Sequence, residues 1–415
     1  VLGASGSGKT TLLYARIRAR AEAGKRSILL VPEQFTSSTE ARIYRELGDA
    51  LSGMVESYSF TSLAEHILAV EGGAAVQTLT DAGRAVLVRR ALEELQDNVH
   101  YYYRHRRSAA FCQMAAETID ELKSAGLSGQ QLQELARDCG TESAKLGELA
   151  LIFQGYESLL AGTGMDPADR LELAADRLEA ALARDELPDF LREREVFIDE
   201  FDTFNAPKKR LMGAMLAALP AVTVALCEDG APMQPGDLEL FSGAKQVAAQ
   251  LRQLARKNGA QVAAPELLRR DLRHKDAPGL AALTELLETG SCTSPESAPE
   301  LRLFAAASRE EEARCAAAAI RRLMRQGVRC GKIAVVCRDI SLYRAAVRYE
   351  FRMAEIPLYC DEPTTPEFSA PATAVRCLLA IARGAELTEQ LTTLAKTGLC
   401  ALTEEEVCAL ENYAY

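Results

Sequence analysis

The chain has 415 residues, of which 48% are hydrophobic and 26% charged, and its formal net charge is −11. This length fits two or more ordinary globular domains, and neither an apolar run of membrane-spanning length nor a signal-peptide pattern is present. The 11 cysteines are scattered without a C-x-x-C pair, so we expect a cytoplasmic protein with no membrane partner, no disulfide framework and no clustered metal ligands in these residues.

The opening stretch VLGASGSGKTTLL matches the phosphate-binding pattern G-x-x-x-x-G-K-[ST] in full. Glycines let backbone N–H groups approach phosphate oxygens, Lys9 supplies charge for the β- and γ-phosphates, and Thr10 supplies a hydroxyl for Mg²⁺. A chance glycine-rich turn is disfavoured, because a strand end precedes the loop and a helical pattern follows it. Since no methionine precedes Val1, we expect that residue 1 is not the natural start. The predicted nucleotide-binding residues are Gly3, Ala4, Ser5, Gly6, Ser7, Gly8, Lys9, Thr10 and Thr11.

Residues 1–76 alternate between strand and helix patterns. RSILLVPEQ (26–34) is a short apolar strand that ends at a proline, and VESYSF (55–60) is a second strand. Between them, SSTEARIYRELGDAL (37–51) is an amphipathic helix that we expect to begin at an N-cap serine. The order β-α-β-α-β predicts an α/β domain with a parallel sheet.

A helical block interrupts this domain. Residues 81–183 are rich in Leu, Ala, Glu and Arg with helical periodicity, and SGQQL (128–132) and DPADR (166–170) are typical helix starts. Strand patterns return at REVFIDEF (194–201) and AVTVALCED (221–229), so the block is an insertion into the α/β domain. The later basic run LRRDLRHK (268–275) is expected to be a solvated loop or helix end.

An acidic pair ends the strand VFIDE (196–200). A phosphate-binding loop needs a partner carboxylate near Mg²⁺, and Asp199 would serve the metal while Glu200 would orient or deprotonate the attacking water. The alternative is an ordinary exposed acidic pair at a strand end. Lys9 and Asp199 are 199 − 9 = 190 residues apart, a separation that the helical insertion explains and that a compact nucleotide kinase would rarely need.

A second α/β unit is expected after the linker-like GSCTSPESAPE (290–300). Strand patterns at 300–306, 332–339 and 357–362 alternate with helical patterns at 310–327 and 342–356, and helices follow to the end. The stretch 313–352 carries ten Lys or Arg and two acids, 10 − 2 = +8, which fits either a phosphate-binding face or a solvated helix face.

This layout resembles a superfamily 1 helicase motor of the UvrD/PcrA kind. PEQFTSSTEARI (32–43) is similar to that family's segment after the second strand, and SYSFTSLAEHIL (57–68) to its T-F-H-S-like segment. The resemblance implies DNA contacts by Gln34, Ser59 and Phe60, although Phe60 also suits a core position. It places Arg338 at the arginine that reaches across to the γ-phosphate. The tract HYYYRHRR (100–107) suits either a single-strand platform or a packed turn.

Within that superfamily the amino-acid sequence most resembles the B subunit of the AddAB helicase–nuclease. Examples are LVPEQFT (30–36), FIDEFDTF (197–204) and TGLCALTEEEVCALENYA (397–414). The resemblance implies ATP and Mg²⁺ as cofactors, and single-stranded DNA or duplex ends as the bound nucleic acid. It also implies a heterodimer with an A subunit that carries the main motor, and break processing for recombinational repair. The family's nuclease domain and iron–sulfur cysteines are expected beyond residue 415.

The implied fold class is α/β: a P-loop, RecA-like parallel-sheet domain with a helical insertion, then the start of a second RecA-like domain. The predicted boundaries are 1–76 and 186–290 for the first RecA-like domain (1A), 77–185 for the insertion (1B), 291–300 for the linker, 301–384 for the start of the second RecA-like domain (2A) and 385–415 for the start of a helical segment similar to subdomain 2B.

Three hypotheses remain open: an ATP-binding subunit of a helicase–nuclease, a DNA-binding scaffold with a vestigial P-loop, and an unrelated P-loop enzyme such as a kinase. The intact loop and Glu200 favour the first over the second, and the insertion disfavours the third. The motor's γ-phosphate-sensing glutamine has only a loose counterpart, Gln234 in CEDGAPMQPGD (227–237). The later arginine motifs of the helicase family would fall past residue 415, so we expect ATP binding with very slow turnover.

Overall fold

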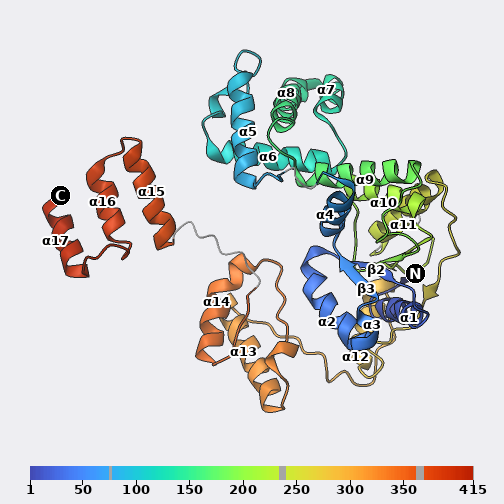
Figure 1. Cartoon of the computed structure of the whole chain (residues 1–415). Helices are drawn as coiled ribbons and strands as arrows, with labels where there is room; N and C mark the ends of the chain where they lie inside the picture. The colour runs from blue at the N-terminus through green and yellow to red at the C-terminus, as the bar shows by residue number, and fades with distance from the viewer. Residues whose placement is uncertain (74–76, 233–239, 361–368, 415) are drawn as a thin grey trace. The chain divides into compact units, whose positions relative to one another are not determined.

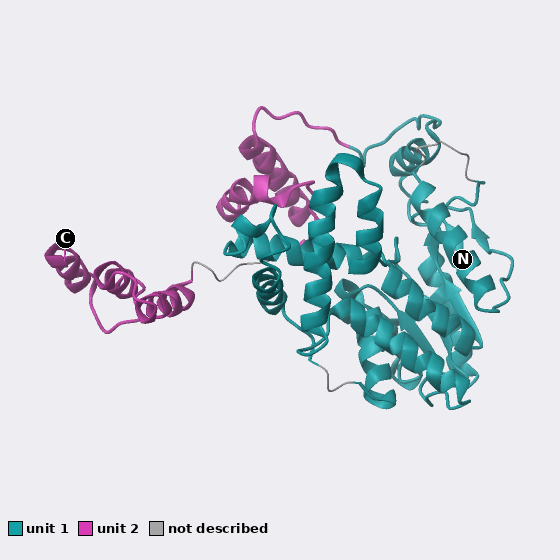
Figure 2. Ribbon diagram, turned by 90° about the horizontal axis from the view of Figure 1, so that it is seen from above, with its two compact units in different colours: residues 1–301 teal, residues 302–415 magenta. Residues whose placement is uncertain are grey.

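The computed structural model describes residues 1–73, 77–232, 240–360 and 369–414 (Figure 1). The chain divides into two compact units, Val1–Leu301 and Arg302–Tyr415, which are coloured separately in Figure 2. In the described residues, no helix combines the length and the apolar character needed to cross a membrane.

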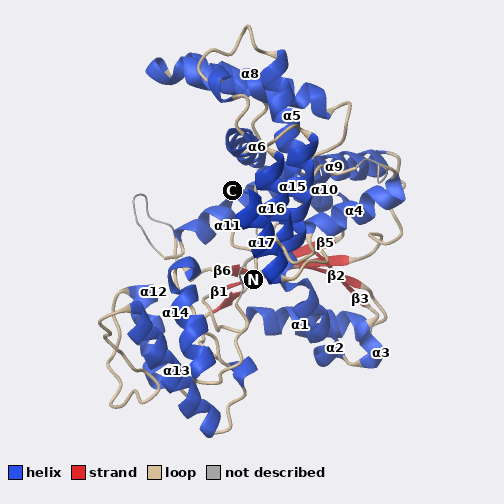
Figure 3. Cartoon of the chain, turned by 90° about the vertical axis from the view of Figure 1, so that its left-hand side faces the viewer, coloured by secondary structure: helices blue, strands red, loops and turns tan. Residues whose placement is uncertain are grey.

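Parallel strands form the centre of unit 1 (Figure 3). One sheet has the order β6-β1-β7, and the other has the order β3-β2-β4-β5. The prediction of an α/β fold with parallel sheets is confirmed. The strands are β1 (Leu2–Gly3), β2 (Ser27–Leu30), β3 (Val55–Tyr58), β4 (Glu195–Ile198), β5 (Ala221–Val224), β6 (Leu226–Cys227) and β7 (Leu267–Leu268).

The predicted strand 221–229 is divided between the two sheets. The backbone N–H of Ala225 donates to the carbonyl oxygen of Ile198 at 2.9 Å, whereas the next N–H, from Leu226, donates to Val1 at 3.0 Å. The chain therefore changes its pairing partner at Ala225, which joins the β1 sheet to the β4 sheet.

Two helical layers cover the central strands of unit 1. Side chains that alternate along a strand point to opposite faces, so Ile28 and Leu30 join one core while Leu29 joins the other. The Ile28 face packs against α4 (Phe60–Glu71), α9 (Pro167–Ala183), α10 (Ala206–Ala218) and α11 (Ser242–Lys257). The Leu29 face packs against α1 (Lys9–Glu22), α2 (Thr36–Leu47) and the short α3 (Asp49–Ser52). These two layers are visible on either side of the strands in Figures 1 and 3.

The helix α2 begins earlier than the sequence predicts, and its predicted N-cap serine is wrong. A 3₁₀ turn, η1 (Glu33–Phe35), runs directly into Thr36, so the N-cap residue is Phe35, which makes no side-chain capping bond. The Ser38 hydroxyl instead donates to the carbonyl oxygen of Phe35 at 2.9 Å. The 3₁₀ turn after β2 thus begins the helical geometry, in place of a capping serine.

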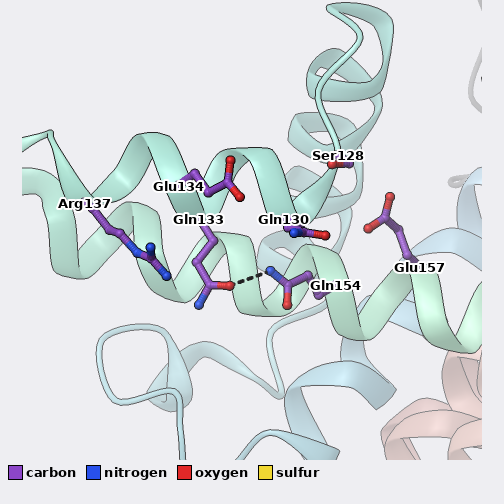
Figure 4. A pocket seen from close by; sticks show the side chains of 7 residues that line it. All are labelled: Ser128, Gln130, Gln133, Glu134, Arg137, Gln154 and Glu157. Atoms are coloured by element: carbon purple, nitrogen blue, oxygen red, sulfur yellow. Dashed lines mark hydrogen bonds between the residues drawn. The ribbon is translucent and has the colours of Figure 1, made fainter.

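The helical block has its own core. This core is formed by α5 (Asp81–Glu94), α6 (Ala109–Ser124), α7 (Gly129–Arg137) and α8 (Ser143–Leu160). The 3₁₀ turns η2 (Tyr103–His105) and η3 (Gly140–Glu142) lie between these helices. Both predicted helix starts are confirmed: Ser128 caps α7, and Asp166 caps α9 with Pro167 at its first turn. A polar cavity lies between α7 and α8, where Gln154 donates to Gln133 at 2.9 Å (Figure 4).

A buried ionic cluster joins α6, α8 and α9. Lys123 Nζ donates to Asp166 Oδ2 at 2.9 Å and to Asp169 Oδ2 at 2.8 Å, and Tyr156 Oη donates to Asp166 Oδ1 at 2.7 Å. Burial alone would lower the pKa of Lys123, but its bonds to the two carboxylates outweigh burial and raise it. Because α9 lies in the sheet core, this cluster attaches the helical block to the sheet.

The regular elements in the described residues of unit 2 are all helices. No strand is present at 300–306, 332–339 or 357–360, so the strands predicted there are wrong; residues 361 and 362 lie outside the description. A strand requires a paired neighbour, and here the apolar side chains stand in solvent: Leu303 is 100% exposed and Val336 91%. The helices of unit 2 are α13 (Arg309–Arg325), α14 (Ile340–Met353), α15 (Ala370–Ala382), α16 (Leu387–Ala395) and α17 (Glu404–Ala414), with the 3₁₀ turn η4 (Cys330–Lys332).

Replacing Lys123 with alanine tests the ionic cluster. The substitution leaves the Asp166 carboxylate buried without its cation, so we expect the free energy of unfolding to fall by about 3–5 kcal/mol, measured by urea unfolding with circular dichroism. The matched control is Lys145→Ala, which breaks only the exposed 3.6 Å ion pair with Glu142 and should cost less than about 1 kcal/mol. Equal losses in the two variants would contradict the proposed role of the cluster.

Candidate functional site

A cavity of about 470 Å³ lies where β1 and β4 end in unit 1. Five separate segments line it: the glycine loop and the start of α1, helix α2, the segment after β4, the chain from the end of β5 into β6, and the segment after β7. The lining residues are Ser5, Gly6, Gly8, Lys9, Thr10, Thr11, Arg42, Asp199, Glu200, Phe201, Asp202, Ala225, Cys227, Leu272 and Arg273. The structure thus brings six of the nine predicted loop residues and the predicted acidic pair to one cavity, whereas Gly3, Ala4 and Ser7 are not among its lining residues.

The conformation of the loop explains its glycines. Gly6 and Gly8 have φ angles of 80° and 92°, in the left-handed region where other residues are strained. A Cβ on Gly3 would overlap the Ser7 hydroxyl and lie 2.8 Å from the carbonyl oxygen of Leu268. The sequence predicted glycines that give phosphates access to the backbone, and the structure adds a steric requirement within the protein itself.

Lys9 begins α1 and turns back over the loop. Its Nζ donates to the carbonyl oxygens of Gly3 at 2.7 Å and Ala4 at 2.8 Å. The positive charge therefore lies against the loop that Lys9 follows in sequence, at the N-terminal end of α1, where the helix dipole adds further positive potential.

The acidic pair after β4 has two unlike members. Asp199 is buried, and its Oδ1 accepts the backbone N–H of Glu200 at 3.0 Å. Glu200 is exposed and has a φ of 65°, a conformation that costs energy for a residue with a side chain. Partial desolvation of its carboxylate by the cavity walls raises the pKa of Glu200, and the charge of Asp199 raises it further, while Arg42 opposes both effects.

Arg42 is a site residue that our sequence analysis did not assign. It projects from α2 into the cavity and lies over the ring of Tyr14, 4.9 Å from its centroid. Burial raises the pKa of Tyr14 to about 12, an effect that Arg42 opposes and the Asp199 and Glu200 charges reinforce. The sequence could have pointed to Arg42, because Arg42 lies in PEQFTSSTEARI (32–43), the segment that resembles the helicase family.

The prediction of a solvated loop at the basic run 268–275 is confirmed in part: beyond Leu268, the last residue of β7, the run has no regular structure and most of its residues are exposed. β7 pairs in parallel with β1, and α12 (Pro278–Thr289) follows the run. What the sequence did not predict is the contact of this run with the glycine loop. The N–H of Leu272 donates to the carbonyl oxygen of Gly6 at 3.0 Å, and Arg273 donates to the Ser5 hydroxyl at 3.1 Å. This segment therefore braces the glycine loop and brings the Arg273 guanidinium to the cavity.

Asp271 holds the bracing segment in shape. Its Oδ1 accepts the backbone N–H groups of Arg273 at 2.9 Å and His274 at 3.1 Å, and its Oδ2 contacts His274 Nδ1 at 2.8 Å. Burial would raise the pKa of Asp271, but these hydrogen bonds outweigh burial and lower it.

The predicted DNA-binding residues have different surroundings. Gln34 is exposed in η1, and Ser59 is buried as the N-cap of α4, where its Oγ accepts the N–H of Ser62 at 3.1 Å. Phe60 is fully buried, with its ring 5.3 Å from Phe201 and packed edge-on against it. This burial argues against base stacking by Phe60 and favours the core alternative, because a stacking ring needs an open face.

Two other expectations stay predictions. Arg338 lies in unit 2, exposed in the loop before α14, so its role at a γ-phosphate stays a prediction. Gln234 lies outside the described residues.

The aromatic tract 100–107 has the features of a packed turn. Glu148 accepts backbone N–H groups from His100 at 2.8 Å, Tyr101 at 2.8 Å and Tyr102 at 3.1 Å, and the Tyr102 ring stacks on Phe111. These contacts favour the packed-turn alternative.

The fold and the cavity define a class: an α/β protein with a parallel sheet, interrupted by a helical block, whose strand ends bring a glycine loop and carboxylates together. Residues 1–284 match the family model described as "ADDB, N-terminal", and the chain belongs to this family. The family resemblance seen in the sequence is thereby confirmed.

Individual relatives agree with the family match. The chain is 32% identical to a protein of Desulforudis audaxviator, 31% to one of Moorella thermoacetica and 31% to one of Symbiobacterium thermophilum. Each of the three is named as the B subunit of an ATP-dependent helicase/deoxyribonuclease. Each alignment covers 100% of this chain but only 36%, 37% and 36% of the relative, so the chain spans little more than a third of their length.

The raised pKa of Glu200 predicts a pH-dependent effect of Glu200→Gln on stability. A raised folded-state pKa means that ionisation of Glu200 opposes folding, a cost that is present at neutral and alkaline pH and disappears once the carboxylate is protonated in both states. The variant should therefore raise the thermal midpoint at about pH 8 and lose this advantage towards about pH 4. Calorimetry at both pH values measures it; an advantage that is absent at alkaline pH would contradict the electrostatic account.

Proposed function

We propose that this chain binds ATP with Mg²⁺ in the cavity at the ends of β1 and β4. The single observation that supports this proposal is the convergence there of Lys9, Thr10, Asp199 and Glu200 from segments 190 residues apart. In the proposal, backbone N–H groups of the loop and the Lys9 ammonium bind the phosphates. Lys9 would exchange its two loop carbonyl partners for phosphate oxygens.

The residues fit a magnesium ion. Thr10 supplies a hydroxyl and Asp199 a carboxylate, both hard oxygen ligands of the kind that Mg²⁺ prefers, and both line the same cavity. The charge of Asp199 disfavours the ionised form of Glu200, and a cation beside Asp199 would offset that effect. When bound, Mg²⁺ would neutralise phosphate charge; Glu200 would then orient or deprotonate water, as the more exposed carboxylate of the pair.

We further propose that the chain acts in a helicase–deoxyribonuclease as the ATP-binding and DNA-binding N-terminal part of its B subunit. The names of the relatives support this, as does the family match. The proposed partner is an A subunit in a heterodimer, the proposed substrate is DNA at double-strand breaks, and the proposed outcome is recombinational repair. Nuclease chemistry and an iron–sulfur cluster are assigned to the remaining two-thirds of such a protein.

A DNA-binding scaffold with a non-hydrolysing loop is the alternative. It is favoured by one observation: Arg338, the proposed arginine across the cleft, lies in an exposed segment of unit 2 without strand pairing. Arg42 and Arg273 in unit 1 favour the ATP-binding proposal, because both line the cavity of Lys9.

Nucleotide titration tests the proposed site. Lys9→Ala removes the ammonium from the loop, so we expect the affinity for Mg·ATP to fall by an order of magnitude or more, measured by isothermal titration calorimetry. Lys145→Ala, an exposed lysine of the helical block, is the matched control and should bind as the parent does. Equal affinities in the Lys9 variant and the parent, or no binding by the parent, would refute the site.

Phosphate release tests how far the site can act alone. We expect residues 1–415 to hydrolyse ATP very slowly and with little stimulation by single-stranded DNA, because an arginine supplied across the cleft is worth several orders of magnitude in rate. Steady-state phosphate release is measured with and without oligonucleotide, and Glu200→Gln reveals any contaminating ATPase. Brisk DNA-stimulated turnover that Glu200→Gln abolishes would show that unit 1 carries a complete hydrolytic site.

A further inference from the structure

A second charged cavity, of about 670 Å³, lies at the other end of the strands that reach the candidate site. Its lining precedes β2, β4 and β5: Lys25 and Arg26 come directly before Ser27, Arg194 directly before β4, and Pro220 directly before β5. Strands β2 and β4 have four residues each, so this cavity is separated from the site by about 13 Å of strand.

The floor of this amino-end cavity is already paired. Arg20, near the end of α1, forms an ion pair with Glu195 at 3.2 Å and donates through Nε to the Ser27 hydroxyl at 3.1 Å. Arg194, whose side chain is only 7% exposed, forms an ion pair with Glu56 at 2.6 Å. These contacts fix two guanidinium groups in place and leave the floor with little net charge of its own.

The rim carries the available positive charge. Lys25 and Arg26 are exposed, and neither forms an ion pair with a carboxylate in the described part of the chain. Arg192 is 57% exposed; its Nη2 donates to the Leu187 carbonyl oxygen at 3.1 Å, and it forms a long ion pair of 3.8 Å with the almost fully exposed Asp189. The lining holds five Lys or Arg and three Asp or Glu, 5 − 3 = +2, in a chain whose net charge is −11.

We propose that this amino-end cavity binds the phosphodiester backbone of single-stranded nucleic acid through Lys25, Arg26 and Arg192. Cations from two segments border one concavity, which suits consecutive phosphates on a flexible strand. Guanidinium groups match the oxygens of phosphate in a two-pronged geometry. The inference deepens the DNA-binding part of the proposed function and depends on it.

The amino-end cavity is separate from the nucleotide site, but α1 and β4 extend from one to the other. Helix α1 starts at Lys9 beside the glycine loop and ends at Glu22, shortly before Lys25, and β4 likewise lies between Arg194 and the acidic pair. Nucleotide and nucleic acid would therefore bind at opposite ends of the same two elements without competing for a residue.

The test is the salt dependence of binding to a labelled oligothymidylate, followed by fluorescence anisotropy from about 50 to about 200 mM salt. The double variant Lys25→Ala with Arg26→Ala removes two rim cations. It should weaken binding on the order of tenfold and reduce the slope of log affinity against log salt by about 1.4, that is, about 0.7 for each lost phosphate contact on a single strand.

The matched control is Arg89→Ala with Arg90→Ala, which removes the same charge from adjacent exposed residues of α5. Equal losses in the two double variants would reduce the effect to overall charge, and an unchanged slope in the rim variant, or no binding by the parent, would overturn the proposal. Binding of polyglutamate with the same rim dependence would instead identify an acidic protein surface as the ligand. Mg·ATP titration of the rim variant should match the parent, so the proposed nucleotide site is judged separately through Lys9.

Discussion

The candidate site depends on one close approach: the glycine loop fits between the start of α1 and the segment after β7. Gly3 can carry no side chain there, because Ser7 and the carbonyl oxygen of Leu268 occupy the space, and the Gly6 carbonyl is held by the Leu272 N–H. Residues 3 and 268 are 268 − 3 = 265 positions apart, so the local loop is shaped by a distant pairing, that of β1 with β7. Any change that separates β7 from β1 would release the loop and withdraw Arg273 from the cavity.

The same constraint explains how a helical block of about a hundred residues is accommodated within the sheet domain. The block does not end at a flexible joint: α9, at its C-terminal side, is packed into the core beside α4 and α10. Lys123 of α6 then reaches the first turn of α9, and Tyr156 of α8 shares Asp166 with it. The buried ion pair fixes the position of the helical-block core relative to the sheet core. Burying its charges costs desolvation energy, which apolar packing would avoid.

Sequence patterns predicted what is locally encoded. Strands β2 and β4 and the caps at Ser128 and Asp166 follow from residues within one element, and all were found in place. What was missed depends on distant partners: β7 has only two residues, and Arg273 becomes a site residue only because β7 pairs with β1. The strands expected in unit 2 failed for the same reason, since an apolar pattern specifies a strand only when a neighbour completes its hydrogen bonds. The role of Phe60 could not be decided from the sequence, because a core phenylalanine and a base-stacking phenylalanine have the same local sequence pattern.

Strand β4 shows how the fold concentrates backbone strain and unfavourable electrostatic energy at the candidate site. Its residues Val196, Phe197 and Ile198 are fully buried and paired on both sides, by β2 and β5, so its end cannot shift to relieve Glu200. Glu200 therefore keeps a strained φ of 65° and a raised pKa, while Phe201 and Phe204 anchor the chain that follows in the core. Two unfavourable terms on one exposed carboxylate are tolerated only where the surroundings over-determine the backbone. Under the ATP-binding proposal, such a cost is expected of a carboxylate that faces a charged ligand beside Asp199.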